Sequence, residues 1–60
     1  MNDQEALDKV LKITRILKEW GMKYVPSFGR SYAEEIFNKT ENDIRNNPEL
    51  RKRLIEVIKD

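Results

Sequence analysis

The sequence predicts an all-α protein, folded as a compact bundle of three helices. Apolar residues recur at the three- and four-residue spacing of amphipathic helices along most of the 60 residues, and strand-like alternation never extends beyond a few residues. Stretches that contain proline or glycine divide this pattern. The helices are expected over about 3–20, 31–46 and 48–59, with an irregular loop over 21–30. A chain this short forms one domain, residues 1–60, with a single core.

The first helix is expected to begin at Asn2 or Asp3, because a short polar side chain there accepts from a free amide of the first turn. Gly21 is expected to end it, since glycine tolerates the left-handed conformation that terminates helices, and Met22 would then pack back on Leu17. Five apolar residues follow the 4,3,4,3 spacing of a buried helix seam. They are Ala6, Val10, Ile13, Leu17 and Trp20.

The apolar residues of this first helix cover an arc of roughly 220°. A helix that packs against two neighbours needs such a wide face, and this is one interpretation. The other is that residues at the flank of the seam are left over and mark a surface for self-association or for a partner. These flanking residues are Leu7, Leu11 and Ile16.

The second helix is expected to open at Ser31, because Glu34 three residues later completes a capping box. Its apolar arc of roughly 140° continues without a phase shift to residue 46, which predicts one unbroken helix. A break near Thr40 is the alternative, since Thr40 and Asp43 repeat the capping pattern. The boundary before the third helix is the sharpest, because Asn47 is a good N-cap and proline suits the first helical position.

These assignments predict a core and a set of surface ion pairs. The core is expected to include Val10, Ile13, Leu17, Trp20, Ile36, Phe37, Ile44, Leu54, Val57 and Ile58. Acidic residues precede basic ones by four positions, the favourable helical orientation, in Glu5–Lys9, Asp8–Lys12, Glu35–Lys39, Glu41–Arg45 and Glu49–Arg53.

The composition argues against catalysis. The sequence has no cysteine and no histidine, so thiolate nucleophiles, cysteine-type zinc sites and the commonest general base are absent. Apolar runs never exceed two residues, which predicts neither a transmembrane helix nor a signal-peptide core. We therefore expect a soluble, intracellular, cytoplasmic protein that is not an enzyme and that has no cofactor, no metal site and no membrane contact.

Two charged strings resemble sites but are expected to be ordinary helix surface. Consecutive helical residues point about 100° apart, so Arg51, Lys52 and Arg53 cannot form one basic patch. The adjacent carboxylates Glu34 and Glu35 diverge for the same reason. Neither string predicts nucleic-acid binding or acid–base chemistry.

The loop and its flanks are the candidate binding site. Between Lys9 and Arg30 the charge is +5, from six basic residues and one acidic residue, in a chain whose net charge is only +1. Basic groups among aromatic ones suit a phosphate backbone or a protein contact, and the third possibility is that Tyr24, Val25 and Phe28 simply close the core. The candidate binding residues are Lys23, Tyr24, Phe28, Arg30 and Tyr32.

The expected function is that of a non-enzymatic protein-interaction module: an adaptor, an inhibitor or a self-associating regulator. It would use the 22–32 loop and the flank of the first helix. The alternative is a small DNA-binding domain of helix-turn-helix type that contacts phosphate through the basic loop and the start of the second helix. The near-neutral charge and a connection of about nine residues count against this alternative.

Overall fold

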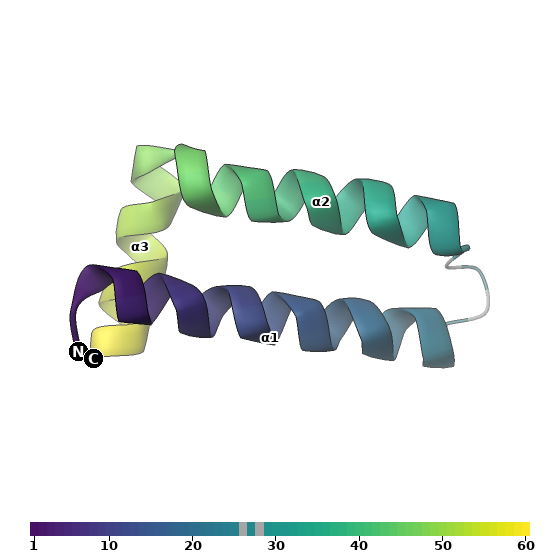
Figure 1. The fold of residues 1–60 in the computed structure, drawn as a ribbon, viewed down its shortest axis with the longest axis horizontal. Helices are drawn as coiled ribbons and strands as arrows, with labels where there is room; N and C mark the ends of the chain where they lie inside the picture. The colour runs from purple at the N-terminus through teal and green to yellow at the C-terminus, as the bar shows by residue number, and fades with distance from the viewer. Residues whose placement is uncertain (26, 28) are drawn as a thin grey trace.

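In the computed structural model, which describes residues 1–25, 27 and 29–60, the chain forms an all-α three-helix bundle, as the sequence predicts. The described helices are α1 (Asp3–Tyr24), α2 (Arg30–Asn46) and α3 (Pro48–Lys59). α1 and α2 lie side by side and run in opposite directions, and α3 crosses them at the end where both termini lie (Figure 1). Each helix contacts the other two.

α1 begins as expected and ends later than expected. The side chain of Asn2 accepts from the backbone amide of Glu5 at 2.8 Å. The prediction that Gly21 ends the helix is wrong: Gly21 is buried inside α1, and no described glycine has a positive φ. The helix ends at Tyr24, and its C-cap residue Val25 is extended and precedes a proline in the sequence. A residue before proline avoids the helical conformation, whereas glycine permits a helix end without requiring one.

α2 begins one residue earlier than expected, and the predicted capping box does not form. The N-cap is Gly29, which has no side-chain cap hydrogen bond, and Arg30 is the first helical residue. This start places Arg30 one turn before Glu34, and the two pair at 3.3 Å between Nε and Oε1. The connection between α1 and α2 is therefore residues 25–29, which is shorter than the expected loop over 21–30.

The remaining boundaries agree with the sequence predictions. α2 is continuous through Thr40, whose hydroxyl donates to the carbonyl of Ile36 at 2.9 Å, so the predicted unbroken helix is confirmed. Asn47 caps α3 by accepting from the backbone amide of Leu50 at 3.1 Å, with Pro48 at the first position of the helix.

We expect Asn47→Ala to lower the free energy of unfolding by about 1 kcal/mol, because it removes the acceptor for a first-turn amide of α3. Asn46→Ala is the matched control, since Asn46 only donates to the side chain of Asn42 on the exposed surface. Urea unfolding followed by circular dichroism measures both variants. Equal losses at the two positions would contradict the assigned cap.

The core is small and lies at the end where α3 crosses the other helices. Its buried cluster is Leu7, Val10, Leu11 and Ile44, and three half-buried residues of α3 pack against it: Leu54, Ile55 and Ile58. Thr14 is also buried, and its hydroxyl donates to the carbonyl of Val10 at 2.9 Å. Among the described residues, no large side chain is completely buried.

The predicted core is therefore only partly correct. Val10 and Ile44 are buried and Phe37, Leu54 and Ile58 are half-buried, but Ile13, Leu17, Trp20, Ile36 and Val57 are exposed. Conversely, Leu7 and Leu11 were expected at the flank of α1 and are core residues. The wide apolar arc of α1 contains two stripes, and the buried one continues through Thr14 and Gly21, which an apolar pattern does not count.

The five ion pairs expected from the sequence are not among those that the described residues form. Glu41 was expected to pair with Arg45 on the same helix. Instead its carboxylate lies 3.3 Å from the Nε of Arg15 on α1, which joins the two antiparallel helices.

Candidate interaction face

A stripe of four apolar side chains on α1 is open to solvent. Ile13, Leu17, Trp20 and Tyr24 follow a 4,3,4 spacing, which places them on one side of the helix, and each is between 49% and 57% exposed. The same stripe begins at Ala6 and Val10, which are buried. One continuous apolar stripe is thus covered at its first end and uncovered over the rest of its length.

The covered part ends where α3 crosses. An apolar hollow of about 340 Å³ lies at this junction, between Val10 and Ile13 of α1, Thr40 of α2, and Leu54, Val57 and Ile58 of α3. Val57, on the edge of α3 beside the hollow, is 74% exposed. α3 therefore borders the uncovered stripe at one end.

α2 contributes the other side of this surface. Thr40 lines the hollow, and Ile36 and Tyr32 precede it at intervals of four residues, so the three lie along one side of α2. Ile36 and Tyr32 are both exposed. We use the name open face for six exposed apolar residues: Ile13, Leu17, Trp20 and Tyr24 of α1, Ile36 of α2 and Val57 of α3.

The two aromatic residues of the open face, Trp20 and Tyr24, contact each other. The rings of Trp20 and Tyr24 have centroids 5.3 Å apart at an interplanar angle of 40°, a favourable tilted arrangement. The ammonium group of Lys23 lies 5.4 Å from the centroid of the Tyr24 ring, within cation–π range. These contacts place the two rings and the ammonium group next to one another at the loop end of α1.

The opposite side of the α1–α2 hairpin is charged. A hollow of about 420 Å³ there is lined by Arg15, Lys18, Glu19 and Met22 of α1 and by Arg30, Glu34, Asn38 and Glu41 of α2. Two ion pairs cross or border it: Arg15–Glu41 and Arg30–Glu34. The two sides of the hairpin therefore have opposite chemical character.

The structure divides the binding residues predicted from the sequence. Tyr24 belongs to the open face, Tyr32 lies one turn from Ile36 at its edge, and Lys23 contacts the Tyr24 ring. Arg30 lies on the charged side, where it pairs with Glu34. Phe28 lies outside the described residues. The residues of the open face that sequence reasoning assigned to the core are Ile13, Leu17, Trp20, Ile36 and Val57.

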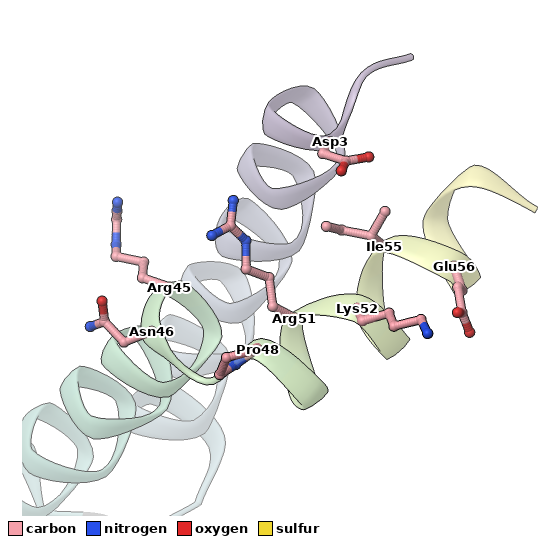
Figure 2. A pocket seen from close by; sticks show the side chains of 8 residues that line it. All are labelled: Asp3, Arg45, Asn46, Pro48, Arg51, Lys52, Ile55 and Glu56. Atoms are coloured by element: carbon pink, nitrogen blue, oxygen red, sulfur yellow. The ribbon is translucent and has the colours of Figure 1, made fainter.

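A further hollow of about 320 Å³, lined mostly by charged and polar residues, lies where α3 meets α2 and the start of α1. Figure 2 shows Arg51 pointing from α3 toward α1, between Arg45 and Asp3, while Lys52 points away beside Glu56. Arg53 lines a different hollow together with Glu49. Arg51 and Lys52 thus line one hollow and Arg53 another, so the three basic residues do not form one patch.

An ion pair joins the first and last helices at this end of the molecule. The Nζ of Lys59 lies 2.6 Å from Oδ1 of Asp3. The hydrogen bond from Lys59 lowers the pKa of Asp3 most strongly, followed by the charge of Lys59 and, more weakly, that of Arg51. Both side chains of the pair are solvent-exposed, so salt screens their interaction.

This pair predicts a small dependence of stability on pH. Because the pKa of Asp3 is lower in the folded chain, the pair stabilises the fold above the unfolded pKa of an aspartate, and this contribution is lost as pH falls below about 4. We expect Asp3→Asn to flatten the decline of stability over this acidic range. The control variant Asp8→Asn should lose stability with falling pH as the wild type does. Thermal unfolding at a series of pH values measures this, and identical profiles for the two variants would contradict the expectation.

Comparisons with known proteins find no relative: no family model, curated protein or solved structure matches the chain. In the part of the chain that the structure describes, no helix is both long enough and apolar enough to cross a bilayer. The same residues contain no cluster of three or more side chains suited to hold a metal ion.

Proposed function

We propose that the chain is a non-enzymatic protein-interaction module that binds by covering its open face. The observation that carries the proposal is the stripe Ile13, Leu17, Trp20 and Tyr24, which continues the buried side of α1 and yet is about half exposed at every position. A contiguous apolar surface of this kind on a small domain is typical of a protein-contact site.

The chemistry of the open face suits protein contact. Tryptophan and tyrosine are enriched among residues that contribute most to binding, because they bury a large area at a small cost in side-chain entropy. Trp20 and Tyr24 lie next to each other, so both rings can contact one partner surface. Compared with the sequence-based expectation, the proposed surface moves from the loop onto the middle of α1, with Tyr24 and Tyr32 at the loop end of it.

The DNA-binding alternative has less support. Arg30, one of the basic residues expected to hold phosphate, pairs with Glu34. Nearby, Lys18 lines the same hollow as Glu19 and Glu41. Lys23 stacks over Tyr24 on the other side of the hairpin. α1 and α2 also run antiparallel (Figure 1), unlike the steeply crossing pair of a helix-turn-helix motif.

We therefore expect no saturable binding to duplex DNA at low salt, because the cations are divided between two sides of the hairpin and partly neutralised. Fluorescence anisotropy of a labelled duplex titrated with the protein measures this. Saturable binding that weakens and becomes less dependent on salt when Lys23 and Arg30 are both replaced by glutamine would instead support the alternative.

Site-specific photo-crosslinking in the cell that expresses the protein tests the proposed function. A benzophenone amino acid replaces Leu17 on the open face or, as the matched control, Met22 on the charged side of the same helix. We expect protein adducts from position 17 that mass spectrometry maps to one defined surface, with far fewer from position 22. Trp20→Glu in the same chain should abolish the adducts. Equal adducts from both positions, or none from position 17, would refute the proposal.

A further inference from the structure

We propose that the open face is covered by a second copy of the chain, so that two copies form a symmetric dimer. This inference rests on the proposed function and adds the identity of the partner. Three properties of the structure support it: the thickness of the hairpin, the area of the open face and the position of α3.

The first property is that the half of the hairpin near the connecting loop is one helix layer thick. The molecule measures 36 × 18 × 13 Å, and in the view down the shortest axis α3 lies over only the end opposite the loop (Figure 1). A stable helical domain normally packs two layers around a core. In the loop half of the hairpin, which holds residues 13–24 of α1 and 30–40 of α2, a second layer must come from outside this part of the chain.

The second property is the area of the open face. Its six side chains are between 36% and 74% exposed. Together they present on the order of 600–700 Å² of accessible surface, which exceeds the largest apolar patch of a typical monomer and approaches the roughly 800 Å² per partner of a standard interface. Two copies of this one surface, if fully covered, would bury a total area at the lower end of the range for specific interfaces.

The third property is the position of α3, which allows one two-fold arrangement of apposed open faces. If both copies pointed the same way, the two α3 helices would occupy the same space over the hairpins. If one copy is instead turned end for end relative to the other, the loop halves of the two hairpins overlap. Each α3 then lies at an outer end of the dimer, beside the connecting loop of the other copy. Val57, at the edge of α3, then faces the partner chain, which accounts for an apolar residue that is 74% exposed.

The charges are compatible with this arrangement. None of the six residues of the open face is an aspartate, glutamate, lysine or arginine. The charged side of each hairpin, with its two ion pairs, stays in contact with water. At +1 per chain, two copies repel each other little.

Sedimentation velocity over a concentration series tests the inference. Between about 1 µM and about 1 mM, we expect the wild type to change from monomer to dimer. Leu17→Glu and Trp20→Glu should each remain monomeric throughout, because a carboxylate would have to be buried in the interface. Met22→Glu is the control: it makes the same change on the charged side of α1 and should dimerise like the wild type.

A second measurement keeps the test valid if a variant fails to fold. The melting temperature of a dimer rises with protein concentration, so we expect this rise for the wild type and for Met22→Glu. A wild type that stays monomeric at about 1 mM, or a Leu17→Glu variant that dimerises with wild-type affinity, would overturn the inference.

The outcomes separate this inference from the proposed function. A monomeric wild type that crosslinks from position 17 to a different protein would refute self-association and leave the interaction module in place. A dimer that Met22→Glu disrupts and Leu17→Glu does not would refute both, because the contact would then lie on the charged side of the hairpin.

Discussion

Leu7→Ala should leave much of the protein unfolded at 25 °C. Leu7 is only 4% exposed and belongs to the cluster with Val10, Leu11 and Ile44. Truncating a buried leucine to alanine costs about 2–5 kcal/mol, through lost burial and the cavity that remains. A single core in a chain of this size supplies only about 3–5 kcal/mol, so the loss is comparable to the whole stability.

Ile16→Ala is the matched control for this prediction. Ile16 is on the same helix and is 62% exposed, so its truncation should change the free energy of unfolding by less than about 0.5 kcal/mol. Chemical unfolding followed by circular dichroism compares the two variants. The sequence pattern alone assigned Leu7 to the flank of the helix, and comparable losses for both variants would restore that assignment.

Thr40→Pro should abolish cooperative folding. Thr40 lies in the interior of α2, where the backbone amide donates to the carbonyl of Ile36, and its hydroxyl donates to that same carbonyl at 2.9 Å. Proline removes the amide donor and forces its ring against the carbonyl four residues earlier, at a cost of about 3 kcal/mol or more. The chain has little more than this in reserve.

Arg30→Pro provides the control for the proline substitution. Arg30 is the first residue of α2, where proline is tolerated, and Gly29 before it is extended at φ −59° and ψ 152°, which a following proline favours. The variant also loses the exposed ion pair with Glu34, which contributes little. We expect a cooperative melting curve for Arg30→Pro and none for Thr40→Pro. A cooperative transition near the wild-type temperature for Thr40→Pro would show that α2 is interrupted there.

Local signals predicted the helices well where they identify a unique partner for a backbone group. Asn2 and Asn47 cap α1 and α3 through hydrogen bonds to the amides of Glu5 and Leu50. The apolar phase through Thr40 also identified α2 as one helix. The boundaries predicted at Gly21 and Ser31 were wrong, because each of these residues permits a helix boundary without requiring one. In the structure Gly21 is buried inside α1, and α2 already begins at Arg30, so neither residue lies at a helix boundary.

The faces of α1 could not be predicted from local pattern. Its apolar arc contains a buried stripe through Leu7 and Leu11 and an open stripe through Leu17 and Trp20. Which stripe is buried depends on where α2 and α3 cross the helix, and this is determined by contacts between residues distant in sequence. The width of the arc did indicate that α1 has more apolar surface than one neighbour covers. The open face agrees with that indication, although five of its six residues, all except Tyr24, were assigned to the core.

The emission of Trp20 across a concentration series tests the central claim most directly, namely that the exposed apolar stripe of α1 is covered by a second copy. Trp20 is the single tryptophan of the chain and is 56% exposed on one copy. We expect its emission maximum to move to shorter wavelength as the protein concentration rises. The midpoint of this shift should lie at the concentration at which sedimentation shows half of the chains in dimers. An emission maximum that stays constant over the whole range would contradict it.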